Sequence, residues 1–225
     1  TVAANAETMI CKEITPPTTI TQPGLYCLLN DFQVNLDSGA AINISANNVV
    51  IDLNGHRVSN ISADPQNTAI GISSYTSGIS APIKSITVRN GTLRGFRTGI
   101  SLISSGTAGH LIEDMFVDKS LQYGISTYGN SVIIRRNRVT GTGSTSELAY
   151  AFGISSGGAN VTIADNDVAD TKSGASAIGI AAGRGLSAYG GPIVTGNRIN
   201  ELHAGEGYDE VAIDVSGNAL VSHNQ

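Results

Sequence analysis

A short strand-like phrase recurs along this chain of 225 residues, and it constrains the fold more than any other feature. The phrase consists of a small residue, usually glycine, followed by isoleucine and then by a small polar residue. Its isoleucines are Ile42, Ile72, Ile100, Ile125, Ile154, Ile180 and Ile213. Consecutive isoleucines are between 25 and 33 residues apart. Self-similarity at such a period is the signature of a solenoid, in which each repeat packs on its neighbours.

A second phrase lies between these isoleucines. It is an alternating strand that ends near Asn or Asp and is followed by one more apolar residue. Examples are VVIDLNGHRV from Val49, SVIIRRNRV from Ser131 and NVTIADNDV from Asn160. Each repeat therefore contains three short strands and a tight bend at the asparagine. This pattern predicts an all-β fold, a single-stranded right-handed parallel β-helix of about seven coils whose strands pair with their counterparts one coil away.

The composition agrees with this fold and excludes some functions. The chain has 27 Gly, no Trp and only 14% charged residues. β-branched residues suit strands, and Gly, Asn and Ser suit turns, while no long window shows helical periodicity. With a net charge of -5 and no basic run, we expect no nucleic-acid partner. No apolar run reaches the roughly 18 residues of a membrane span.

These repeats, together with the opening ITPPTTITQPGLYCLLNDFQV, resemble the right-handed parallel β-helix superfamily, in particular its pectate-lyase-like and NosD-like carbohydrate-binding members. The resemblance extends from Pro17 to Asn224. It implies a secreted, periplasmic or cell-surface protein that interacts with a polysaccharide, with polysaccharide lyase or glycoside hydrolase activity left open. Ca²⁺ is implied as a cofactor only for a lyase. The alternative is a structural or adhesive shaft, similar to adhesins and tailspikes, that forms a homo-oligomer through its Gly/Ser-rich face.

Strict alternation predicts which side chains of the isoleucine strand face the interior. The isoleucines should point inward, and so should the residues two positions earlier, which include Tyr123 and Phe152. Those two rings are then expected as stacked core residues, with sugar-stacking as the alternative. The glycines before the isoleucines should face outward and leave a nearly bare surface for a polysaccharide or a sister chain. The expected carbohydrate-binding residues on this face are Ser101, Ser126, Ser155 and Tyr150.

Catalytic candidates come from the turns that lead into the isoleucine strands. In β-helix lyases and hydrolases, carboxylates beside this sheet bind Ca²⁺ or perform acid and base chemistry. In this sequence only Asp214 stands in the outward column of the strand itself. The candidates are Glu147, Asp170, Glu201, His203, Asp209 and Asp214. The alternative is that these residues are solvated loop charges. No Cys/His spacing typical of a metal site is present, so we expect no such site.

The asparagine bends have a structural interpretation. We expect Asn137, Asn166 and Asn197 to stack from coil to coil and to bond backbone groups at the bend. The residue after each asparagine is charged, and the charges alternate in sign through Arg138, Asp167 and Arg198. Neighbouring coils should therefore form ion pairs, with Arg138 opposite Asp167.

The two cysteines lie near the start of the chain. A disulfide between Cys11 and Cys27 is predicted, with free or buried thiols as the alternative, and it would indicate an oxidising compartment. Residues 1–26 are expected to form an N-terminal cap, and residues 27–225 the β-helix. No C-terminal cap is evident, because the sequence stops within an asparagine bend. This favours further coils in a longer chain, or a partner at that edge.

Overall fold

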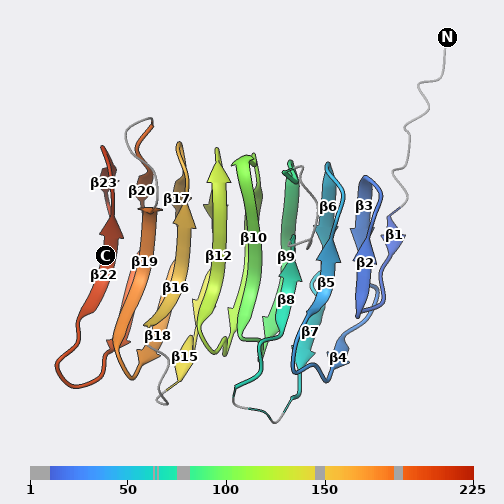
Figure 1. Ribbon diagram of the computed structural model, residues 1–225, viewed down its shortest axis with the longest axis horizontal. Coiled ribbons are helices and arrows are strands. Elements are labelled where there is room, and N and C mark those ends of the chain that lie inside the picture. Colours follow the sequence, from blue (N-terminus) through green and yellow to red (C-terminus); the bar gives the residue numbers. More distant parts are fainter. Residues whose placement is uncertain (1–10, 63, 65, 75–81, 145–149, 185–189) are drawn as a thin grey trace.

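The computed structural model is an all-β parallel solenoid of about seven turns, and it confirms the fold class predicted from the repeats. It describes residues 11–62, 64, 66–74, 82–144, 150–184 and 190–225. Strand β1 lies at one end of a long stack, and β22 and β23 lie at the other (Figure 1). Within the described residues there is no helix long and apolar enough to cross a membrane.

The isoleucine strands form one sheet, called sheet B here. Its eight strands pair in parallel in the order of the chain. They are β2 (Thr18–Ile20), β5 (Ala40–Ile44), β8 (Ile70–Ser73), β10 (Thr98–Thr107), β12 (Tyr123–Asn130), β16 (Tyr150–Gly157), β19 (Ser176–Arg184) and β22 (Glu210–Val215).

The asparagine phrases form a second sheet, sheet A, which is folded into two arms. The first arm contains β1 (Lys12–Glu13), β3 (Gly24–Cys27), β6 (Val49–Asp52), β9 (Ile86–Arg94), β11 (Leu111–Asp118), β13 (Ile133–Arg135), β17 (Thr162–Ala164), β20 (Ile193–Thr195) and β23 (Leu220–Ser222). The second arm contains β4 (Phe32–Val34), β7 (Arg57–Asn60), β14 (Arg138–Thr140), β15 (Gly143–Ser144), β18 (Asp167–Ser173) and β21 (Arg198–His203). The long strands β9 and β11 continue around the bend and belong to both arms.

Columns of aliphatic side chains from the three sides fill the interior. Ile100 and Ile125 of sheet B, Ile112 of the first arm, and Val117 and Val139 of the second arm are all fully buried. Each such side chain contributes roughly 1.5–3 kcal/mol by leaving water. Because every column continues into the next coil, the core is one continuous cluster along the stack.

The bend between the two arms of sheet A is held by stacked asparagines. Asn137, Asn166, Asn197 and Asn224 occupy one column, and each of the first three side-chain Nδ2 atoms donates to the Oδ1 of the next asparagine at 2.9–3.0 Å. The same Oδ1 atoms accept the backbone N–H of the asparagine before them. Asn137, Asn166 and Asn197 are almost fully buried. Their hydrogen bonds thus satisfy buried backbone groups where the ladder of the sheet is interrupted.

The charges that follow the asparagines lie in register but do not all pair as expected. Arg138, Asp167 and Arg198 are Cα partners on consecutive coils. Asp167 forms a two-pronged pair with Arg198 at 3.1 and 2.6 Å, whereas the guanidinium of Arg138 lies 5.2 Å from the centre of the Phe116 ring. The expected Arg138–Asp167 pair is therefore wrong. One carboxylate already holds Arg198, and the aromatic face offers Arg138 a second favourable site.

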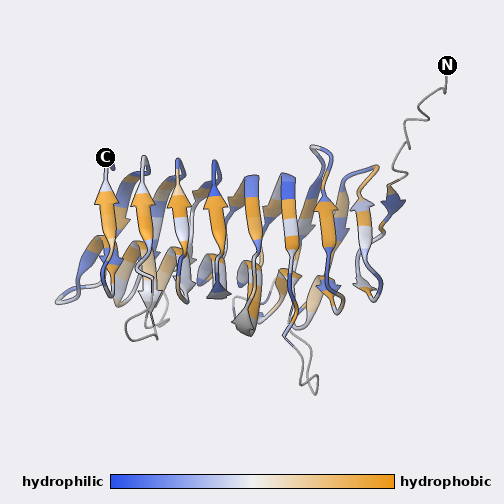
Figure 2. Cartoon of the chain, turned by 90° about the horizontal axis from the view of Figure 1, so that it is seen from above, coloured by the Kyte–Doolittle hydropathy of each residue, from blue (hydrophilic) through white to orange (hydrophobic). Residues whose placement is uncertain are grey.

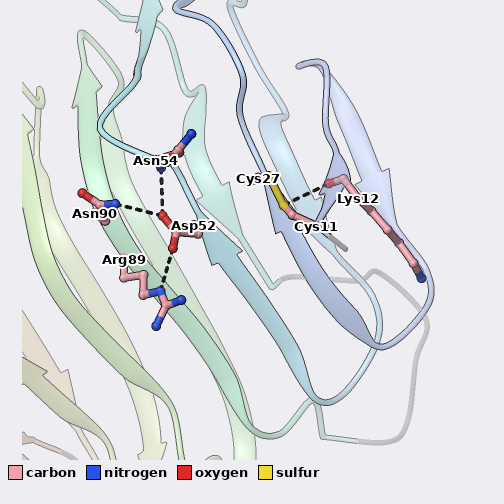
Figure 3. Close-up of a disulfide and its surroundings, with 7 residues drawn as sticks. All are labelled: Cys11, Lys12, Cys27, Asp52, Asn54, Arg89 and Asn90. Carbon is pink, nitrogen blue, oxygen red and sulfur yellow. Dashed lines mark hydrogen bonds and ion pairs between the residues drawn. A yellow bond between two sulfur atoms is a disulfide. The ribbon is translucent and has the colours of Figure 1, made fainter. Parts of the chain in front are cut away.

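The predicted disulfide between Cys11 and Cys27 is confirmed, and it joins the residue before β1 to the last residue of β3 (Figure 3). Residues 12–26 of the segment expected as a cap form β1, β2 and β3. Among the described strands β1 pairs only with β3, and its Lys12 lies over the Tyr26 ring at 5.2 Å. The next turn places Asp52 beside the disulfide, where it accepts hydrogen bonds from Arg89 and Asn90 (Figure 3).

Candidate functional site

The glycines directly before the isoleucines of sheet B face the interior, so the expectation of a bare glycine surface is wrong. A Cβ atom added to Gly99, Gly124 or Gly153 would overlap with a buried valine of the second arm. The valines are Val117, Val139 and Val168. The strand bends at each glycine, so that glycine and the following isoleucine both point inward. A side chain at this position would push the two walls of the core apart, and glycine is therefore a packing requirement.

Because of this local bend, the side chains directly before the glycines point outward and not inward as expected. Tyr123, Phe152, Ile178 and Val211 pack in a small cluster that is separate from the main core. The predicted stacking of Tyr123 on Phe152 is confirmed and Phe152 is buried, but their predicted place in the main core is wrong. They lie on the outer face of sheet B. Strict period-two alternation fails here because two consecutive residues face inward.

The centre of this outer face is aromatic. The rings of Tyr123 and Phe152, from β12 and β16, stack with centroids 5.1 Å apart and planes only 3° from parallel. Tyr150 at the start of β16 approaches Phe152 with centroids at 6.3 Å and remains 50% exposed. Phe152 is 4% exposed, so Tyr150 presents the accessible ring of the group.

The expected serines run beside this aromatic group. Ser101, Ser126 and Ser155 are Cα partners on β10, β12 and β16, and the column continues to Ala181 and Asp214. Ala181 packs in the outer cluster with Phe152, which places the column on the outer face. Ser126 and Ser155 are partly exposed and Ser101 is buried. Hydroxyl groups therefore recur at the coil spacing of about 4.8 Å next to the rings.

The charged candidates gather at the corner where the second arm enters sheet B. Asp170 and Glu201 occupy equivalent positions in neighbouring coils, both with a left-handed backbone (φ of 55° and 54°). Lys172 and His203 are Cα partners, and Lys172 pairs with Asp170 at 2.6 Å. A shallow pocket of about 280 Å³ opens at this corner. It is lined by Lys119, Leu121, Gly141, Thr142, Gly143, Asp170 and Lys172.

The remaining candidates lie elsewhere. Asp209 is exposed in the turn before β22, and its backbone carbonyl accepts the N–H of Ala177. Asp214 lies on β22 at the end of the serine column. Glu147 lies outside the described residues. Within the described part of the chain, no three His, Cys, Asp or Glu side chains are placed to hold a metal ion.

The arrangement favours binding over catalysis. It offers one exposed aromatic ring, a column of hydroxyl groups, and a corner of mixed charge on one side of the rings. The corner carboxylate Asp170 is neutralised by Lys172, while Glu201 and His203 are exposed. Sequence reasoning considered Tyr123 and Phe152 as sugar-stacking residues but favoured the core. The glycine directly after each of these aromatic residues is the sequence feature that could have indicated the bend.

Comparisons of this chain with family models, curated proteins and solved structures gave no match. The fold is thus established by the parallel strand ladders themselves, and function has to be argued from the surface.

Proposed function

We propose that this protein binds a polysaccharide along the outer face of sheet B, centred on Tyr150. The observation that carries the proposal is the aromatic group of Tyr150, Tyr123 and Phe152 on an exterior face, beside a column of serine hydroxyls. An aromatic ring provides an apolar platform for the C–H face of a sugar, and its surroundings supply hydrogen bonds to the sugar hydroxyls.

The shape of the face supports a polymer as the ligand. The coils repeat every 4.8 Å or so, and the same residue types recur along the stack, so a chain of sugars meets similar groups over a long distance. The charged corner with Asp170, Lys172, Glu201 and His203 borders the rings and supplies further polar partners. The Cys11–Cys27 disulfide is typical of an oxidising compartment and supports a secreted, periplasmic or cell-surface location.

A glycan array followed by calorimetry tests the proposal. Replacing the exposed ring in Tyr150→Ala should weaken binding of the glycan found on the array by about tenfold, corresponding to about 1.4 kcal/mol. Leu29→Ala is the control, because Leu29 is 49% exposed and lies between β3 and β4 of sheet A, away from this face. Equal affinity of wild type and Tyr150→Ala would exclude this face as the binding surface.

A release assay separates a binding module from an enzyme. Uronate polymers are incubated with the protein with and without Ca²⁺, and unsaturated or reducing products are measured. Binding without product identifies a binding module. Product release that is lost in Glu201→Gln, with binding retained, would assign a catalytic role to the charged corner.

A further inference from the structure

The outer face of the first arm of sheet A carries a continuous apolar stripe. One residue of each strand from β3 to β23 contributes to it, and these residues are Cα partners from strand to strand. The stripe consists of Leu25, Val50, Thr87, Leu111, Ile133, Thr162, Ile193 and Leu220. Figure 2 shows these strands as its front row, with no other segment drawn in front of them.

Three of these side chains are clearly exposed although they are aliphatic. The exposed fractions are 38% for Ile133, 39% for Ile193 and 58% for Leu220. For Ile133 and Ile193, the neighbours in sequence, Ile134 and Val194, point inward and are fully buried, so the exposure of these two is a property of the outer face. On β23, the last strand of the stack, Val221 next to Leu220 is 44% exposed as well. Large contiguous apolar patches on a soluble protein usually mark an interaction surface.

The order of residues along the stripe is symmetric about its middle. Reading from either end, the stripe has two aliphatic residues, a threonine, two aliphatic residues, a threonine and two aliphatic residues. Consider a two-fold axis that runs along the strand direction, midway between β11 and β13. It would bring a second copy onto this face with its stack reversed, so that aliphatic residues of the two stripes meet and Thr87 of one copy faces Thr162 of the other. An isologous interface of a homodimer requires such self-complementarity.

The charges beside the stripe fit the same axis. The outward-facing residues two positions after the stripe form a charge column, which contains Glu113 on β11 and Arg135 on β13. The residues after these, Asp114 and Arg136, begin the bend and form a bend column. Reversing the stack sets Glu113 against Arg135 and Asp114 against Arg136 of the other copy. Within one chain these groups already attract each other, since Arg136 binds both Glu113 and Asp114 at 2.8 Å.

The charge column adds no electrostatic repulsion on the strands farther from the axis. The reversed copy sets Asp52 against Thr195 and Arg89 against Ala164, so no like charges meet in this column. A two-fold axis along the stack would keep every strand level with its own copy, but it would reverse the strand direction. With the stripes superposed, the charge column would then face the uncharged residues two positions before the stripe, such as Gly109 and Ser131, and would find no opposite charge in the other copy. Charge complementarity thus selects the antiparallel arrangement.

We infer that the first arm of sheet A is a homodimer interface, in which two copies pack face to face with their stacks antiparallel. The face is about 34 Å long, from eight strands at a spacing of about 4.8 Å, and it presents the stripe, the charge column and the bend column. Three columns over this length approach the 20–30 residues a side of a standard interface. The interface lies on a different surface from sheet B and does not depend on the proposed function.

Sedimentation equilibrium tests the dimer. Wild type should be dimeric, and Ile133→Lys/Ile193→Lys should raise the dimer dissociation constant at least tenfold, because it buries unpaired charges in the apolar stripe. The matched control is Ile61→Lys/Ile103→Lys, which alters two exposed isoleucines off this face (57% and 47% exposed) and should leave the dimer intact. A wild type that is monomeric up to about 1 mM, or a dimer that survives in Ile133→Lys/Ile193→Lys, would overturn the inference.

The orientation is tested with a single spin label. Both native cysteines are in the disulfide, so a label on Leu220→Cys is unique in each chain. The antiparallel dimer places the two labels about 35 Å apart, at opposite ends of the stack. A separation near 10 Å, the distance between two packed sheets, would show that the stacks are level and would contradict the arrangement.

Discussion

At the scale of single residues, the stacked asparagines explain how the chain turns sharply at the same place in consecutive coils. Asn166 donates to Ile134 O, Ala164 O and Asn197 Oδ1, and its own Oδ1 accepts two hydrogen bonds from Asn137. Ile134 and the asparagines are buried, and the bond to Ala164 O is partly buried. At the bend, the side-chain amide of asparagine therefore makes the hydrogen bonds that a backbone amide would make in a strand.

Removing one member of this column should be costly. Asn166→Ala leaves the buried N–H of Asn137 without its acceptor and Ile134 O without its donor, and we expect a loss of about 3 kcal/mol in the free energy of unfolding. Urea denaturation measures this loss. The exposed Asn218 provides the control, since Asn218→Ala should change stability by less than about 0.5 kcal/mol. Similar effects of both substitutions would show that the stacked side chains are dispensable.

At the scale of a strand, the glycine bend of sheet B decides which residues reach solvent. It brings two consecutive residues to the interior and turns Tyr123 and Phe152 to the outer face. The valine column of the second arm occupies the space that a side chain at glycine would need.

The orientation of Gly153 predicts an unfavourable Gly153→Ala substitution. Its new methyl group would overlap with Val168 and crowd the carbonyl of Gly179, and we expect a loss of about 2 kcal/mol in stability. In a Val168→Ala background the same substitution should cost at least about 1 kcal/mol less, because the overlap is relieved. An outward glycine would give the opposite result, with a neutral or slightly stabilising Gly153→Ala.

The sequence was sufficient for the strands and the register, but not for the direction of each side chain. The spacing of the isoleucines from Ile72 to Ile180 predicts the sheet B register observed in the structure. Alternation alone could not reveal the bend at glycine, because the reason for it, Val168, comes from a different strand. The Arg138–Asp167 prediction failed for a similar reason. Register places both neighbours of Asp167 within reach, but only packing against Phe116 decides which arginine it binds.

At the scale of the whole molecule, the interior contains a buried histidine beside its apolar side chains. His110 is buried, and its Nδ1 accepts the backbone N–H of Ile86 at 3.2 Å, so its hydrogen is on Nε2, which has no partner among the described residues. Burial lowers the pKa of His110 from 6.5 to about 4. The folded protein therefore takes up this proton only near pH 4, whereas the unfolded chain takes it up near pH 6.5.

This difference predicts that acid destabilises the fold. The unfolded state binds more protons between pH 6.5 and pH 4, so stability falls as pH falls through this window, by about 3 kcal/mol in all, and levels off below it. Urea denaturation at pH 7.5 and 4.5 measures the effect. His110→Val loses the hydrogen bond to Ile86 and is less stable at pH 7.5, but its stability should change much less with pH. Equal pH dependence in both proteins would contradict the assignment to His110.

The assembled molecule presents two long faces with different chemistry. Sheet B displays exposed Tyr150 and the serine hydroxyls, and the first arm of sheet A displays an apolar stripe with paired charges. A polysaccharide on the first face leaves the second free for another copy. Two binding faces in one antiparallel dimer would double the contacts to a repeating ligand.

The central claim, that sheet B is the polysaccharide-binding face, is tested most directly by NMR. Backbone amide shifts are recorded while the glycan found on the array is titrated into the labelled protein. The account predicts that the largest shifts fall on Tyr123, Ser126, Tyr150 and Ser155, with little change at Ile133, Ile193 and Leu220. Shifts concentrated on the first arm of sheet A, with sheet B unchanged, would contradict it.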